Sequence, residues 1–132
     1  MGLPYELEVH QDYLHIKHPP GMVIEPDSTH EMWAQIGRLC AEHGCSRVLI
    51  EAEGPKRKLD TMEAFDSGKL LAENTSGLSI AICFTDYEFD DLTTFFKTVA
   101  QNRGVRVDFF SSVEDACSWL GVKAGELAAE SR

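Results

Sequence analysis

The sequence predicts an α/β domain with a mixed sheet of about five strands and about four helices. Three observations lead to this class. The chain opens on two short stretches in which apolar and polar residues alternate, as is typical of an antiparallel hairpin. Three apolar stretches of strand length follow, and patterns with helical spacing lie between and after them. Repeated strand-helix-strand units then favour a parallel core with right-handed crossovers and helices on both faces.

The predicted hairpin joins residues 5–10 to residues 13–18. Its single polar face indicates the edge of the sheet, because central parallel strands are covered on both sides. A loop rich in proline and glycine follows as far as Pro26, and we expect it not to continue the strand.

A helix is predicted over residues 29–43, with Asp27 or Ser28 as its cap and Gly44 as its end. The next strand covers residues 47–52. Its uninterrupted apolar centre is expected of a strand buried on both faces.

Asp60 and Glu63 have the spacing of a capping box, although Asp replaces the usual Ser or Thr, and they predict a second helix. Within it, Gly68 would allow close packing against a strand. A strand over residues 78–84 and a polar loop lead to a third helix that ends before Gly104. The predicted buried face of that helix consists of Leu92, Phe95, Phe96 and Val99.

Residues 105–110 form the last predicted strand, after which Ser112 caps a short fourth helix and Gly121 ends it. The domain is therefore predicted to span residues 1–121. We expect residues 122–132 to be a frayed tail.

The composition and the N-terminal sequence argue against several classes of binding partner and location. The formal net charge of −10 argues against nucleic acid or anionic lipid as the main binding partner. Both are negatively charged and bind proteins that carry an excess of Lys and Arg. The N-terminus has no basic segment leading into an apolar stretch, and no stretch approaches the roughly 18 apolar residues of a membrane span. We expect a cytoplasmic protein with no nucleic-acid partner and no membrane span.

The cysteines and histidines do not predict a metal site or a catalytic centre. No CxxC pair is present, so buried reduced thiols are expected rather than metal ligands or disulfides. The histidines lack the spacing of a metal-binding motif. No GxSxG elbow, Walker loop or Rossmann turn occurs, so we predict no catalytic residue, no metal and no cofactor. The residues considered are Cys40, Cys45, Cys83, Cys117, His10, His15, His18, His30 and His43.

The opening YELEVHQDYLHIK, the strand RVLIEA and the closing NRGVRVDFFSSVEDACSWL, in the order of a hairpin followed by strand-helix units, resemble SpoIIAA-like or STAS domains. The resemblance covers roughly residues 5–121 and is strongest to a bacterial STAS-like group placed near the CRAL-TRIO lipid-binding domains. It implies the fold described above. For function it implies either a regulatory module or a carrier.

The resemblance also suggests a phosphorylation site. STAS proteins that antagonise anti-sigma factors carry an Asp-Ser-Ser-Gly type motif at the start of the helix after the third strand, and a partner kinase phosphorylates its serine. Asp60 and Thr61 match its first two positions, whereas Met62 and Glu63 depart from it. Thr61 is therefore a candidate phosphoacceptor. Both matching residues are also explained as the start of a helix, which is the interpretation we favour.

Ligands of open α/β sheets gather beyond the carboxyl ends of the strands, here residues 51–58, 85–89 and 110–112. In the first of these loops, three basic residues directly precede a helix N-terminus and would suit an anionic ligand, unless they are simply solvated. They are Lys56, Arg57 and Lys58.

In the second loop, Tyr87 and Phe89 could form an aromatic, acidic surface for a protein partner. The acidic residues next to them are Asp86, Glu88 and Asp90. Alternatively, one or both rings fold over the edge of the sheet.

We favour a noncatalytic regulatory or interaction module that presents residues 56–63 and the aromatic loop to a protein partner. The alternative is a carrier of a small apolar or anionic ligand or a lipid, held between helix and sheet. A carrier needs an apolar cavity of a few hundred cubic ångströms, whereas close contact at Gly68 and Ala72 favours a filled interface. The sequence leaves open the partner's identity and the oligomeric state, including a homodimer.

Overall fold

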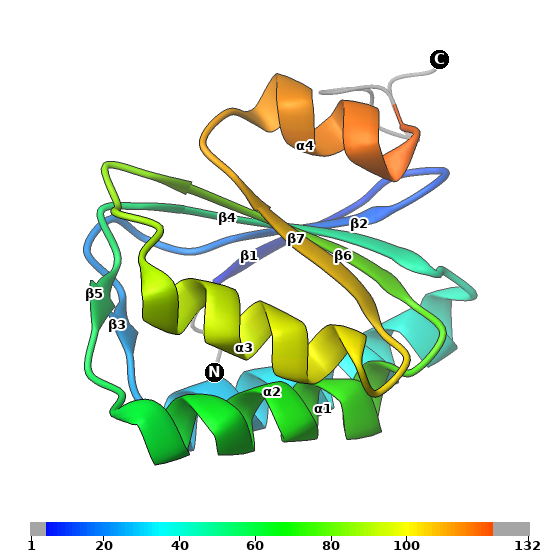
Figure 1. The fold of residues 1–132 in the computed structure, drawn as a ribbon. Coiled ribbons are helices and arrows are strands. Elements are labelled where there is room, and N and C mark those ends of the chain that lie inside the picture. The colour runs from blue at the N-terminus through cyan, green and yellow to red at the C-terminus, as the bar shows by residue number, and fades with distance from the viewer. Residues whose placement is uncertain (1–4, 123–132) are drawn as a thin grey trace.

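The computed structural model describes residues 5–122. Its main sheet has the strand order β1-β2-β4-β6-β7, with helices on both faces (Figure 1). β1 and β2 are antiparallel and the later pairs are parallel, so the fold class predicted from the sequence is confirmed. The strands are β1 (Glu6–Val9), β2 (Leu14–Lys17), β4 (Arg47–Glu53), β6 (Ser79–Thr85) and β7 (Arg106–Phe110).

The β1–β2 hairpin lies at one edge of this sheet, as the alternating pattern predicts. The turn is closed by a 2.9 Å hydrogen bond that the His10 N–H donates to the Tyr13 carbonyl oxygen. Leu14 and Ile16 are fully buried on one face. Because successive side chains of a strand point to opposite faces, His15 lies on the other.

Three helices cover the first of these faces: α1 (Pro26–His43), α2 (Thr61–Thr75) and α3 (Asp91–Gln101) (Figure 1). Two glycines allow them to approach each other closely. A Cβ at Gly37 of α1 would collide with the carbonyl oxygen of Asn74 in α2. A Cβ at Gly68 of α2 would lie 2.9 Å from the carbonyl oxygen of Phe96 in α3. Gly68 therefore packs against a helix, and the prediction that it packs against a strand is wrong.

A single short helix, α4 (Val113–Leu120), lies on the opposite face (Figure 1). It packs over β4, β6 and β7, where Ala116, Cys117 and Leu120 join Leu49 and Ala81 in a second apolar cluster. One short helix thus covers the part of this face formed by β4, β6 and β7.

The predicted helix ends are largely confirmed. Asp60 and Glu63 form a complete capping box, with hydrogen bonds of 2.8 and 2.9 Å between each side chain and the other residue's backbone N–H. Ser112 caps α4, and Gly44 ends α1 in the left-handed conformation.

The start of α1 was predicted wrongly. The helix begins at Pro26, earlier than Asp27 or Ser28 would allow as caps, and Glu25 stands at the N-cap without a side-chain capping bond. Proline suits the first helical position because its φ is already helical and its missing N–H would have no partner within the helix.

Two segments predicted as loops form a second, parallel sheet. β3 (Val23–Ile24) pairs with β5 (Lys56–Arg57), and the N–H groups of Lys56 and Lys58 donate to the carbonyl oxygens of Met22 and Ile24 at 2.8 and 2.7 Å. Two-residue strands are too short for an alternating pattern to reveal. The loop before Pro26 does not continue β2, as predicted, but the prediction that it contains no strand of its own is wrong at Val23–Ile24.

Phe95 was predicted to be buried but is 37 % exposed and stacks on Phe65 of α2. Phe96 and Val99 are buried as predicted, and Thr93 and Ala100 complete the core-facing side of α3. An aromatic residue at helical spacing was mistaken for a core position because the pattern does not show where the layer of helices ends.

Among residues 5–122, no helix has the length and apolar character needed to cross a membrane. Of the predicted frayed tail, only Val122 falls within the described residues.

Candidate functional site

The carboxyl ends of β4 and β6 lie at the same edge of the molecule, beside β3 and β5 (Figure 1). The Gly54 N–H donates to the Thr85 carbonyl oxygen at 2.8 Å, which holds the two loops together. Asp86 follows with a positive φ of 53°, a conformation that turns the chain sharply. Of the three loops that the sequence predicted as a site, residues 51–58 and 85–89 are thus brought together.

Arg57 of β5 links these loops through its guanidinium. It donates two hydrogen bonds, of 2.8 and 2.7 Å, to the carboxylate of Asp90 and a longer one, of 3.2 Å, to the Tyr87 hydroxyl. The hydrogen bonds from Arg57, followed by the backbone N–H of Thr93, hold the pKa of the Asp90 carboxyl well below its usual range. Asp90 also caps α3 through that N–H, so one carboxylate fixes both β5 and α3.

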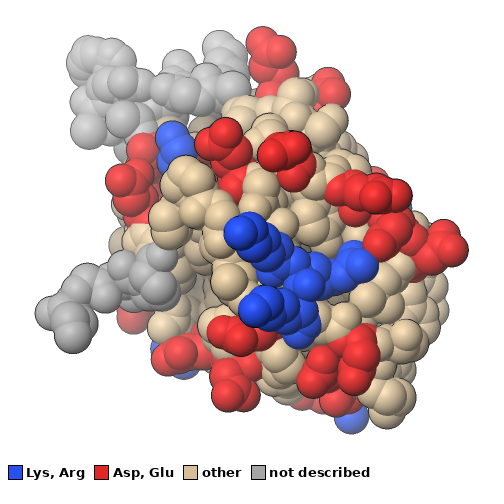
Figure 2. Space-filling model, turned by 90° about the vertical axis from the view of Figure 1, so that its left-hand side faces the viewer, with Lys and Arg blue, Asp and Glu red and all other residues tan. Residues whose placement is uncertain are grey.

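The three basic residues that the sequence predicted as one anion site lie in two different environments. Arg57 is committed to Asp90 and Tyr87, whereas Lys56 and Lys58 on either side of it are exposed. Figure 2 shows that Lys and Arg residues gather on the face that carries β3 and β5, and that acidic residues surround them. The exposed residues of β3 and β5 are called the β5 face below, together with Lys58, Met62 at the start of α2 and Phe89.

Apolar side chains of the β5 face are exposed as well. Val23 of β3 is the register partner of Lys56 and is 39 % exposed. Met62, in the first turn of α2, is 67 % exposed, and Phe89 is 39 % exposed. The β5 face therefore combines positive charge with accessible apolar groups.

The two aromatic residues of the second loop behave differently. Tyr87 is half-buried, contacts Phe84 edge-on with ring centroids 5.2 Å apart, and bonds to Arg57. Phe89 leans on Tyr87 and Phe109 but keeps part of its ring in solvent. Only Phe89 remains suited to anchoring a partner.

An apolar pocket lies beneath β3 and β5, between the three helices and the sheet. Its cavity volume is about 60 Å³, and its lining includes Met22, Trp33, Phe84, Leu92 and Phe96. Small-molecule sites usually measure roughly 300–1,000 Å³. The pocket as it stands is therefore too small for a lipid.

A second hollow of about 300 Å³ adjoins the first on the other side of β3. Both are lined by Met22, Thr29 and Met32. Met22 and Met32 therefore separate the two spaces, and methionine side chains change conformation readily.

Thr61, the candidate phosphoacceptor, is the exposed first residue of α2. Its neighbour Asp60 is occupied by the capping box, which accounts for the pair as a helix start. Phosphorylation of Thr61 stays a prediction.

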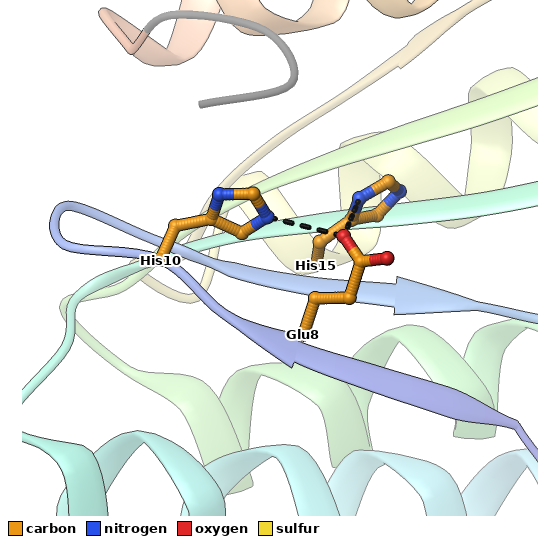
Figure 3. A group of neighbouring side chains, drawn as sticks. All are labelled: Glu8, His10 and His15. Carbon is orange, nitrogen blue, oxygen red and sulfur yellow. Dashed lines mark hydrogen bonds and ion pairs between the residues drawn. The ribbon is translucent and has the colours of Figure 1, made fainter. Parts of the chain in front are cut away.

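A group of side chains that sequence reasoning did not bring together lies on the α4 side of the hairpin. Glu8, His10 and His15 each offer one metal-binding atom, and these atoms all lie within 4.8 Å of one another. Figure 3 shows both rings directed toward the same carboxylate oxygen. The signal was present in the sequence, because Glu8 and His10 are two residues apart and Glu8 faces His15 across the hairpin.

The cysteines are free thiols, and three are buried, as predicted. Burial raises the pKa of the Cys40 and Cys83 thiols to about 11. Since the thiolate is the reactive form, these residues are poor nucleophiles at neutral pH.

Neither a protein-family model nor a curated protein matches this chain. The resemblance to STAS-like domains therefore stays a prediction, and the function is inferred from the geometry of the site.

Proposed function

We propose that this protein is a noncatalytic interaction module whose β5 face binds a protein segment carrying both acidic and apolar side chains. The observation that carries the proposal is the composition of that face. Lys56 and Lys58 are exposed in a chain of net charge −10, and the exposed Val23 is the register partner of Lys56. Met62, four residues after Lys58, is exposed as well, and the partly exposed Phe89 contacts Tyr87, which bonds to Arg57 between the two lysines.

Each part of the face has a role in binding. The apolar side chains supply contact area that loses water on binding, and the lysines attract carboxylates and orient them. The surrounding acidic residues repel a segment whose carboxylates fall outside the basic centre. Charge placement thus favours one register of the partner over others.

The face is also held in place before a partner arrives. Arg57 fastens β5 to Asp90 at the start of α3, and β5 pairs with β3. Binding therefore costs little ordering of the module itself, which favours affinity.

Site-specific photocrosslinking in the native host tests the proposal. A photoreactive phenylalanine analogue replaces Met62 on the β5 face or, in the matched control, Phe95 on α3, which is also apolar and exposed. We expect position 62 to capture discrete protein segments rich in Asp, Glu and apolar residues. Synthetic peptides of those segments should then bind the wild-type protein in fluorescence anisotropy.

Charge reversal provides the second arm. The double change Lys56→Glu and Lys58→Glu should weaken peptide binding about 10-fold or more. The double change Arg47→Glu and Lys69→Glu alters net charge equally at exposed positions outside the face and should have little effect. Equal capture from positions 62 and 95, or equal loss in both double variants, would contradict the proposal.

A carrier of a small apolar ligand is the second candidate function. It is favoured by the two methionines, Met22 and Met32, that line both hollows. If Met22 and Met32 move aside, the two hollows join into one space. Native mass spectrometry of protein purified from its own host distinguishes the candidates. A stoichiometric copurified small molecule supports the carrier, whereas a clean apoprotein mass argues against it.

A further inference from the structure

The cluster on the α4 side of the hairpin is separate from the β5 face. Glu8 and His15 are register partners of β1 and β2, so their side chains are nearest neighbours on one face of the hairpin. His10 follows β1 directly, and its ring stacks on Tyr13 with centroids 4.3 Å apart and planes 11° apart. The fold therefore delivers all three side chains to one point.

The distances match those of a metal site. The Glu8 Oε1 atom lies 3.2 Å from His10 Nε2 and 3.4 Å from His15 Nδ1. In a tetrahedral zinc site with ligand bonds of roughly 2.0–2.1 Å, the donor atoms lie roughly 3.3 Å apart. Two edges of such a tetrahedron are thus already formed around one carboxylate oxygen (Figure 3).

A fourth residue orients His15 as a metal ligand. The other ring nitrogen, Nε2, lies 2.8 Å from Glu51 Oε1 of β4. A carboxylate oxygen only accepts hydrogen bonds, so Nε2 carries a proton. In the neutral ring, Nδ1 then presents its lone pair to the Glu8 carboxylate, and these two acceptors repel each other unless a cation lies between them. A carboxylate that holds the far nitrogen of a ligating histidine is a recurrent feature of metal sites.

We propose that Glu8, His10 and His15 bind a divalent transition metal, with Zn²⁺ as the preferred ion and Glu51 as the residue that positions His15. Two imidazoles and one carboxylate suit zinc, whereas Ca²⁺ and Mg²⁺ favour all-oxygen sites. The His10 side chain is only 1 % exposed, while that of Glu8 is 43 % exposed. The ion therefore reaches the site from the Glu8 side, and a water molecule completes its coordination there.

Metal titration of the full-length protein, stripped with a chelator, tests the site. Isothermal titration calorimetry with Zn²⁺ should show one site. His15→Gln and Glu8→Gln should each weaken binding about 100-fold or more, and Glu51→Gln about 10-fold, as is typical of residues that orient a ligand. His43→Gln, at an exposed histidine in the last turn of α1, is the matched control and should bind like wild type.

Two further measurements keep the outcome decisive. Co²⁺ should give the intense visible absorption of a tetrahedral site in wild type and not in Glu8→Gln, a change that keeps the size and shape of a half-exposed side chain. Zn²⁺ should raise the melting temperature of wild type and of His43→Gln but not that of Glu8→Gln, because it binds the folded hairpin. The proposal is overturned if wild type binds Zn²⁺ no better than Glu8→Gln, or if His43→Gln loses as much affinity as Glu8→Gln.

Discussion

The histidines on the two faces of the sheet lie in opposite environments, one apolar and one acidic. On the three-helix face, His18 is packed against Tyr5 and Met32, and burial lowers its pKa to about 4. On the α4 face, His15 lies between the carboxylates of Glu8 and Glu51. The difference follows from coverage, because three helices exclude water from one face whereas α4 packs over only part of the other. The three-helix face packs its histidine among apolar and aromatic side chains, whereas the α4 face places His15 beside the carboxylates of the proposed metal site.

The largest expected effect contrasts the two apolar clusters. Leu71 of α2 is fully buried within the larger cluster, and Leu120 of α4 belongs to the smaller one. We expect Leu71→Ala to lower the free energy of unfolding by about 4 kcal/mol and Leu120→Ala by about 2 kcal/mol, since a thin layer relaxes around a cavity more easily. Urea unfolding with an unchanged m-value measures both.

Equal losses in the two variants would show that α4 is as firmly packed as the three-helix layer. A larger loss for Leu120→Ala would contradict the comparison. Either result would weaken the account of the α4 face as the less covered one.

The second prediction concerns His18 and pH. Its folded pKa of about 4 lies below the unfolded value of about 6.5, so protons bind preferentially to the unfolded chain as the pH falls through this window. Stability is therefore intact above about pH 7, and His18 should cost about 2 kcal/mol at pH 5. Urea midpoints at pH 8 and pH 5 should converge in His18→Leu.

The exposed His43 again serves as the control, because His43→Gln should keep the full loss of stability between pH 8 and pH 5. If His18→Leu retains that loss as well, the three-helix face does not hold its histidine neutral. The contrast between the two faces would then fail at its clearest residue.

Sequence reasoning succeeded where a local pattern determines the structure. The alternation in residues 5–18, the capping box of Asp60 and Glu63 and the αL end at Gly44 each depend on neighbours in the chain. It failed where distant segments meet. The β3–β5 pairing joins two-residue strands far apart in sequence, and the exposure of Phe95 depends on where the layer of helices ends.

The same limit applies to the candidate site. Lys56, Arg57 and Lys58 were recognised as a basic group from composition alone, but the separation of Arg57 from the two lysines required its contact with Asp90. The grouping of Glu8 with His15 follows from the register of the hairpin, whereas the alternating pattern predicts only that a hairpin forms. Register, once a hairpin is predicted, is the information that would have revealed this cluster.

The smallest expected effect tests how β5 is held over the three-helix face. Arg57→Met removes the ion pair with Asp90 but keeps an unbranched apolar stem, and we expect a loss of about 1 kcal/mol at pH 7 because both side chains are partly exposed. The folded pKa of Asp90 is depressed, so the stabilisation is present above the unfolded carboxyl pKa of about 4 and is lost as the pH falls through the folded value. The difference in stability between wild type and Arg57→Met should therefore shrink below about pH 4.

Hydrogen exchange at pH 7 shows where Arg57→Met loosens the structure. We expect faster exchange at the backbone amides of Lys56 and Lys58, which bond to β3 and the residue before it, and unchanged exchange in α4. Lys58→Met, which leaves the ion pair intact, should change neither. Acceleration in α4 as well would mean that Arg57 stabilises the whole fold, and that the β5 face is not a separately anchored part of the three-helix side.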